Sequence, residues 1–237
     1  MDQLTLENYN HLKSKGQKIL KVVSRTVHTS GLENILEGPG IMVPNHYNWK
    51  DILVLGTQIP RPLCFVCQEE LLDEKKFTKS VIDVSSETVP FWGRVVYPIT
   101  SSISRYVVSQ LSKIEDALIP VALRGGNNGE FIQNSYEKLI QGDLVCIFPE
   151  TRKKKNKHEA LMPFKSGFAR LAYHAESNGL SIPIYPTAIK NSMGLIKDIE
   201  LVIGKPHYLI IGEENSREDI SAFIQIIEGE VNSMLYN

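Results

Sequence analysis

Short apolar runs of strand-forming residues alternate with helical stretches along most of this 237-residue chain. The strand-like runs span residues 41–43, 63–66, 118–123, 144–148 and 182–189, and the helical stretches span residues 49–58, 73–84, 131–141, 164–178 and 216–236. This alternation predicts an α/β fold with a mainly parallel sheet flanked by helices on both faces. Ligands of such sheets bind beyond the carboxyl ends of the strands. The loops after Val43, Leu123 and Phe148 should therefore lie in one region.

Residues 1–30 are expected to form an N-terminal helical segment that precedes the main domain, residues 31–237. An amphipathic helix is predicted over residues 12–27, because apolar residues recur at helical spacing and basic residues lie opposite. The apolar set is Leu12, Ile19, Leu20, Val23 and Val27, and the basic set is Lys18, Lys21 and Arg25. Such a helix either packs on the core with a solvated basic face or lies on a membrane surface over anionic headgroups.

The charge of the chain is nearly balanced, with 26 Lys and Arg against 27 Asp and Glu. No global field therefore attracts nucleic acid or a membrane, and any attraction has to come from local patches. Three cysteines and the lack of a leading apolar signal segment indicate a reducing, cytoplasmic setting. No apolar run approaches the ~20 residues of a spanning helix, so the chain is not expected to cross a bilayer by itself.

The loop after residue 43 holds a histidine and an aspartate five positions apart, His46 and Asp51. On one regular helix this spacing would rotate the two side chains roughly 140° from each other. In a loop that enters a helix they can meet, and the carboxylate can then hold one ring nitrogen while the other nitrogen takes a proton. Such a pair is a candidate general base. The alternative is a structural loop histidine.

Basic and hydroxyl side chains follow two other strand-like runs. Glu150, Thr151, Arg152 and Lys153 follow the run 144–148, with more lysines behind them, and Arg124 follows the run 118–123 ahead of a glycine-rich turn. Side chains of this kind can bind a phosphate or another anion at a strand end. The alternatives are a solvated basic loop and an ordinary surface arginine. No nucleic acid is expected as a partner, because the lysines lack interleaved aromatic residues.

As an ordered set, these motifs resemble those of the glycerolipid acyltransferase family, which includes the 1-acylglycerol-3-phosphate acyltransferases. Asn45, His46 and Asp51 match the family's first motif, which is Asn-His, four residues and Asp. Residues 119–124 match its second motif, an apolar strand that ends in arginine, and residues 148–152 match its third, Phe-Pro-Glu-Gly-Thr-Arg. Residues 182–186 match its fourth motif, a strand that contains proline. The resemblance covers about residues 41–190. This chain lacks the glycine between Glu150 and Thr151, which shortens the loop and bears mainly on the headgroup, and its stretch 85–113 is longer than expected.

The resemblance implies that residues 31–237 are an acyltransferase domain. It would move a fatty acyl group from an acyl-CoA or acyl carrier protein to a hydroxyl of a lysophospholipid or glycerol phosphate, in phospholipid biosynthesis or remodelling. His46, oriented by Asp51, would be the catalytic base. The substrate-binding residues implied are Arg124, Glu150, Thr151 and Arg152, and the basic Lys153 that follows them is expected to bind substrate as well. No metal or other cofactor is implied, and the expected location is cytoplasmic and peripheral on the cytoplasmic face of the membrane.

Two other functions stay open on the sequence. One is a non-catalytic lipid-binding protein on the same fold. The shortened loop at Glu150 would then indicate that catalytic turnover has been lost. The other is an acyl thioesterase, in which water replaces the alcohol at the same base. For a transferase, His46→Ala and Asp51→Asn are expected to abolish activity without loss of stability, whereas a lipid-binding protein would keep its affinity in both variants. A serine hydrolase and a nucleotide-dependent enzyme are not expected, because their glycine-rich motifs are lacking.

Overall fold

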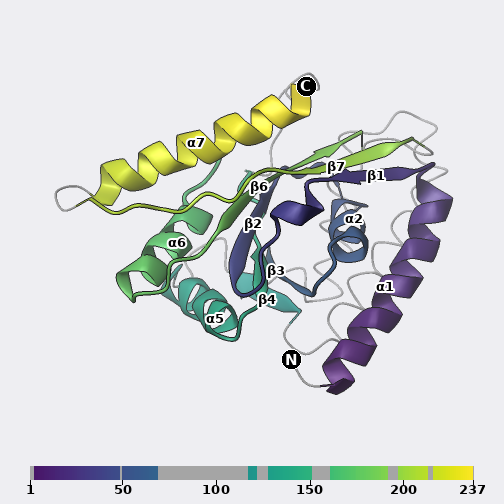
Figure 1. Ribbon diagram of the computed structural model, residues 1–237, viewed down its shortest axis with the longest axis horizontal. Coiled ribbons are helices and arrows are strands. Elements are labelled where there is room, and N and C mark those ends of the chain that lie inside the picture. The colour runs from purple at the N-terminus through teal and green to yellow at the C-terminus, as the bar shows by residue number, and fades with distance from the viewer. Residues whose placement is uncertain are drawn as a thin grey trace.

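The computed structural model describes residues 3–48, 50–68, 117–121, 128–150, 161–191, 197–212 and 216–236. Within these residues, seven strands form one sheet in the order β1-β7-β6-β2-β5-β3-β4 (Figure 1). The strands are β1 (Val27–Ser30), β2 (Gly40–Pro44), β3 (Leu63–Gln68), β4 (Leu118–Val121), β5 (Leu144–Cys146), β6 (Ile184–Lys190) and β7 (Ile199–Ile203). Neighbouring strands are parallel except β6 and β7. The prediction of a mainly parallel sheet is confirmed.

Helices cover both faces of the sheet, as the alternation of elements predicts. They are α1 (Gln3–Val23), α2 (Lys50–Gln58), α5 (Asn128–Ile140), α6 (Gly167–Ser177) and α7 (Ser216–Tyr236), with a short 3₁₀ helix, η1, over Leu32–Asn34. Figure 1 shows α1 and α2 on one side of the sheet and α5, α6 and α7 on the other. The expected helix over residues 73–84 and the long stretch 85–113 lie outside the described residues.

Each central strand sends alternate side chains into two separate cores. In β2, Ile41 and Val43 pack with residues of α5, α6 and α7, whereas Met42 between them packs with residues of α1 and α2. All three side chains are fully buried. Burial on both faces explains why the strands of the sequence read as continuous apolar runs instead of alternating ones. Each such side chain contributes about 1.5–3 kcal/mol of transfer free energy.

The N-terminal helix differs from the prediction at its end. The helix stops at Val23. Val27 begins β1 and lies opposite Ile199 of β7. The hydroxyl of Ser24 donates to the carbonyl oxygen of Leu20 at 2.6 Å, and the N–H of Arg25 donates to the carbonyl oxygen of Lys197 at 3.0 Å. Backbone pairing with a distant strand thus overrides the local helical periodicity. The division of the chain at residue 30 stays a prediction.

The apolar face of α1 packs on the protein. Leu20 and Val23 are buried, and Leu12 and Ile19 are partly buried in the same core as α2. Residues 18, 21 and 25, which carry the basic groups, are exposed. The interpretation of α1 as a core-packing helix with a solvated basic face is therefore confirmed. None of the described helices is both long and apolar enough to cross a membrane.

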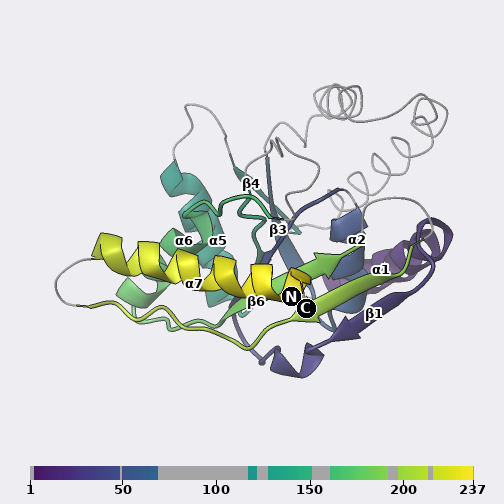
Figure 2. The same ribbon diagram turned by 90° about the horizontal axis from the view of Figure 1, so that it is seen from above.

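The C-terminal helix α7 runs alongside α6 on its face of the sheet (Figures 1 and 2). Phe223, Ile227 and Val231 of α7 are buried in the core that also holds α5 and α6. The ring of Phe223 lies 6.3 Å from that of Phe168 in α6, which in turn lies 6.3 Å from the ring of Phe164 just before α6. This packing fixes α7 against the segment that precedes α6.

Candidate active site

His46 and Asp51 meet at the carboxyl end of β2. His46 lies in the loop after the strand and Asp51 in the first turn of α2. The Nδ1 atom of His46 lies 3.0 Å from Oδ2 of Asp51, and the Asp51 side chain is fully buried while that of His46 is 40% exposed. Because one imidazole nitrogen faces a buried carboxylate, the other is left for proton exchange.

Asp51 also organises the loop that carries its partner. Its Oδ2 accepts the backbone N–H groups of Tyr47 at 2.6 Å and Asn48 at 2.8 Å. Asn48 in turn caps α2, since its Oδ1 accepts the N–H of Lys50 at 2.9 Å. Hydrogen bonds to an ionised carboxylate are roughly twice as strong as neutral ones. The loop backbone and the imidazole are therefore held by one carboxylate.

A second anchor precedes the histidine. Asn45 is fully buried at the end of β2, and its side-chain amide makes two hydrogen bonds with the backbone of Ile189 in β6. Reasoning from the sequence used Asn45 only as part of a motif and did not assign this role. Its position directly before His46 at a strand end was the available signal.

The loop after β5 meets the loop after β2, as expected for neighbouring parallel strands. One carboxylate oxygen of Glu150, Oε1, accepts the backbone N–H of His46 at 2.6 Å, and Oε2 accepts the N–H of Met162 at 2.9 Å. The ring of Phe148 lies 4.3 Å from the His46 ring at an interplanar angle of 36°. In this structure Glu150 thus holds the backbone of the histidine loop, in addition to any contact with a substrate.

Two further ionisable groups lie next to the His46–Asp51 pair, Tyr47 in the loop and Lys50 at the start of α2. Burial, together with the nearby carboxylates of Glu150 and Asp51, raises the pKa of Tyr47 to about 12. Burial lowers the pKa of Lys50, although the adjacent Asp51 opposes this shift. The phenol of Tyr47 therefore keeps its proton at neutral pH and can act as a hydrogen-bond donor. Sequence reasoning missed both residues, because their burial depends on tertiary packing.

The structure brings three of the predicted site residues together, namely His46, Asp51 and Glu150. The others, Arg124, Thr151, Arg152 and Lys153, lie outside the described residues. The described part of the chain contains no group of three or more His, Cys, Asp or Glu side chains arranged to hold a metal ion.

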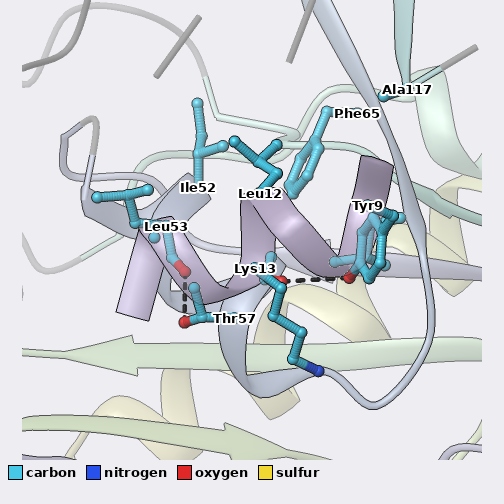
Figure 3. Close-up of a pocket in the computed structure, with 11 residues that line it drawn as sticks. Tyr9, Leu12, Lys13, Ile52, Leu53, Thr57, Phe65 and Ala117 are labelled. Carbon is cyan, nitrogen blue, oxygen red and sulfur yellow. Dashed lines mark hydrogen bonds between the residues drawn. The ribbon is translucent and has the colours of Figure 1, made fainter. Parts of the chain in front are cut away.

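An apolar cavity lies between α1, α2 and β3 (Figure 3). Leu12, Ile52, Leu53 and Phe65 supply much of its lining, and the hydroxyl of Tyr9 donates to the carbonyl oxygen of Gly56 at 3.2 Å. Its volume is about 30 Å³. As the described residues line it, a cavity of this size holds one or two water-sized groups.

Comparison with known proteins supplies independent information about this arrangement. The model of the Acyltransferase family matches residues 26–190. Over 171 aligned residues the chain is 25% identical to a Saccharomyces cerevisiae protein named 1-acyl-sn-glycerol-3-phosphate acyltransferase. The aligned region covers 72% of this chain and 45% of the yeast protein. The chain thus spans less than half the length of this curated relative.

The fold is also similar to a solved structure. The crystal structure of PlsC from Thermotoga maritima, described as a 1-acyl-sn-glycerophosphate (LPA) acyltransferase, superposes with a TM-score of 0.56 at 16% sequence identity. The superposition covers 95% of this chain and 79% of the other. At this identity the likeness shows a common fold.

Proposed function

The chain belongs to the acyltransferase family, and on that premise we propose that it is an O-acyltransferase acting on lipids. The donor would be a fatty acyl thioester, either acyl-CoA or an acyl carrier protein. The acceptor would be a hydroxyl of a lysophospholipid or glycerol phosphate. The activities for which the yeast relative and the Thermotoga structure are named support this acceptor class.

The observation that carries the proposal is the His46–Asp51 pair, held at 3.0 Å with the carboxylate buried and the imidazole partly open. With Nδ1–H donating to Asp51, Nε2 of His46 takes the proton of the acceptor hydroxyl while its oxygen attacks the thioester carbonyl carbon. The tetrahedral oxyanion then collapses, the C–S bond breaks, and the imidazolium returns its proton to the leaving thiolate. No acyl-enzyme is needed.

General base assistance of this kind supplies about 10²–10⁴-fold in rate, so positioning and oxyanion stabilisation must supply the rest. Positioning is supported by the anchoring of the loop through Asn45, Asp51 and Glu150. Within this proposal, Arg124 and Arg152, together with Glu150 and Thr151, hold the acceptor's phosphate and glycerol parts. Lys153 suits the phosphates of the donor or an anionic membrane, because guanidinium and ammonium groups bind phosphate oxygens.

The cytoplasmic location and peripheral attachment to a membrane belong to the same proposal. The exposed basic residues Lys18, Lys21 and Arg25 support contact with anionic headgroups. Because the apolar face of α1 packs on the core, this contact would be electrostatic and weakened by salt.

The test is acyl transfer by the purified protein. Labelled acyl-CoA and acyl carrier protein donors are offered with lysophospholipids and glycerol 3-phosphate, to wild type, His46→Ala and the control His11→Ala, which changes an exposed histidine of α1. Acceptor-dependent ester formation that is lost only in His46→Ala supports the proposal. Free fatty acid released in the presence of acceptor would instead indicate a thioesterase. Lipid binding without turnover in any of the proteins would indicate a binding protein.

A further inference from the structure

A carboxylate of the C-terminal helix reaches the segment that follows the loop after β5. Oε2 of Glu228, in α7, accepts the backbone N–H of Phe164 at 2.8 Å, and the Glu228 side chain is partly buried. Residue 228 lies beyond the stretch 26–190 that the family model matches. The four family motifs therefore give no reason to expect this contact.

The segment 161–165 is held from its other side by the residues next to His46. Phe164 forms a β-bridge with Glu150, and the N–H of Lys165 donates to the carbonyl oxygen of Pro149 at 2.9 Å. The N–H of Met162 donates to Oε2 of Glu150, whose Oε1 accepts the N–H of His46. A continuous series of hydrogen bonds thus runs from Glu228 through the segment 161–165 and Glu150 to the backbone of His46.

The helix that carries Glu228 is well anchored. Ile227, the neighbouring residue, and Val231, one turn later, are fully buried. The rings of Phe164, Phe168 and Phe223 pack in sequence between the segment and α7. Because α7 is fixed in the core, the Glu228 carboxylate presents a charged acceptor to Phe164 at a defined place, and charge-assisted bonds of this kind are strong and directional.

We propose that Glu228 is a positioning residue for the transfer reaction: it holds the segment 161–165 against Glu150 and thereby keeps His46 aligned with its substrate. This role rests on the proposed function of His46 as general base. The chemistry is sensitive to such support, because a displacement of about 1 Å at a reacting group can cost around 10²-fold in rate. Glu228 itself touches no reacting atom, and it acts through Glu150.

Three variants of Glu228 and one matched control separate positioning from simple stabilisation. Glu228→Ala removes the acceptor, Glu228→Gln keeps an oxygen that can accept the Phe164 N–H, and Glu228→Asp keeps the charge but withdraws it by one methylene. The control is Glu230→Ala, on the same helix, whose carboxylate lies 2.8 Å from Nε2 of His207 and not at the segment 161–165. Glu228→Asp provides the comparison if Glu228→Ala does not fold.

The expected result is a fall in kcat of about tenfold or more in Glu228→Ala, a smaller fall in Glu228→Asp and in Glu228→Gln, and little change in Glu230→Ala. KM should change less than kcat, since the defect lies in alignment of the base. Unchanged kcat in Glu228→Ala and Glu228→Asp, with only the melting temperature lowered, would overturn the proposal and leave Glu228 as a stabilising residue.

A second readout does not depend on turnover. The imidazole resonances of His46, assigned by their loss in His46→Ala, are compared among the variants by ¹H–¹⁵N NMR. They should shift in Glu228→Ala and stay in place in Glu230→Ala. If the wild type transfers no acyl group, the proposed function fails, while this comparison still decides whether Glu228 positions His46. Identical His46 resonances in all folded variants would contradict the positioning role.

Discussion

The side-chain amide of Asn45 forms two hydrogen bonds with the backbone of Ile189, accepting its N–H at 2.7 Å and donating to its carbonyl oxygen at 3.1 Å. Asn45 lies just beyond the last residue of β2, Pro44, and Ile189 lies in the neighbouring strand β6. The side chain therefore continues the hydrogen bonding between the two strands where their backbone pairing ends. It does so one residue before His46, so the strand pair and the base are joined at this point.

Asn45→Ala should lower both stability and activity. It leaves the buried N–H and carbonyl oxygen of Ile189 without their partner, which should reduce the free energy of unfolding by roughly 2–4 kcal/mol. Urea denaturation measures this loss. The control is Asn178→Ala, at the end of α6, where the exposed amide donates to the carbonyl oxygen of His174 at 2.7 Å. An equal loss in the two variants would contradict the anchoring role of Asn45.

Asp51→Asn is expected to cost stability as well as activity. The sequence predicts loss of activity alone, but in the structure Oδ2 of Asp51 also accepts the N–H groups of Tyr47 and Asn48. Removal of the negative charge weakens these bonds, so the free energy of unfolding should fall by about 1–2 kcal/mol. Acyl transfer should fall by about 10²–10⁴-fold.

His46→Ala is the matched comparison for Asp51→Asn. The His46 side chain is 40% exposed, and its removal leaves the two backbone bonds of Asp51 in place. Activity should therefore be lost with little change in the urea midpoint. If Asp51→Asn and His46→Ala had the same stability, the structural role assigned to Asp51 would be wrong.

Two glycines with similar backbone conformations should respond differently to alanine. Gly31 has φ +78° and Gly38 has φ +88°, both in the left-handed region. A Cβ on Gly38 would meet nothing within 4 Å, whereas a Cβ on Gly31 would collide with the carbonyl oxygen of Ile203 in β7. Gly38→Ala should cost about 1–2 kcal/mol of conformational energy.

Gly31→Ala should cost roughly 1–3 kcal/mol more than Gly38→Ala, because the turn between β1 and η1 has to move away from β7. Thermal or urea unfolding of the two variants measures the difference. If the two variants were equally destabilised, the backbone of Gly31 would lie farther from the carbonyl oxygen of Ile203 than in the structure.

Because Tyr9 is buried, the protein should lose stability in alkaline solution. Burial raises the pKa of its phenol to about 12, while the unfolded chain ionises near ~10. The folded state thus holds the phenolic proton more tightly than the unfolded chain does. The contribution of Tyr9 to the free energy of unfolding is complete below pH ~10 and declines as the pH rises toward the folded pKa. By pH 11 the loss from this residue should be roughly 1 kcal/mol.

The Tyr9→Phe variant isolates this effect. It loses at every pH the bifurcated hydrogen bond that the phenol donates to the carbonyl oxygens of Gly56 and Arg61, so it should be less stable at pH 9. Between pH 9 and 11, however, its urea midpoint should fall less than that of the wild type. Parallel declines in the two proteins would show that Tyr9 does not ionise with a raised pKa.

The elements that the sequence predicts well are those whose own residues decide their structure. The runs that became β2, β3 and β5 are apolar on both faces, and the helical stretches that became α2, α5 and α7 have one apolar side. The start of the helix predicted at residue 164 was wrong, since α6 begins at Gly167. There the backbone of Phe164 forms a β-bridge with Glu150 and donates its N–H to the Glu228 carboxylate instead of continuing the helix.

The neighbouring strands β1 and β7, at one end of the sheet, show the opposite case. β1 has only four residues, and β7 alternates buried and half-buried side chains after a stretch without a clear strand signal. Neither strand was predicted, and Val27 of β1 was assigned to the preceding helix. β1 becomes a strand because β7 supplies its backbone partners, with Thr29 opposite Leu201 in the register, and β7 itself also pairs with β6. A pairing between residues so far apart in the chain leaves little trace in the local periodicity.

By itself, the sequence determined the α/β class, the order of the central elements and the pairing of His46 with Asp51, because these follow from local periodicity and from a loop only five positions long. Tertiary structure decided what surrounds that pair. The bonds from Asn45 to Ile189 and from Glu228 to Phe164 join residues distant in the sequence. Buried polar groups need hydrogen-bond partners wherever the fold supplies them, and only the packed chain determines which groups those are.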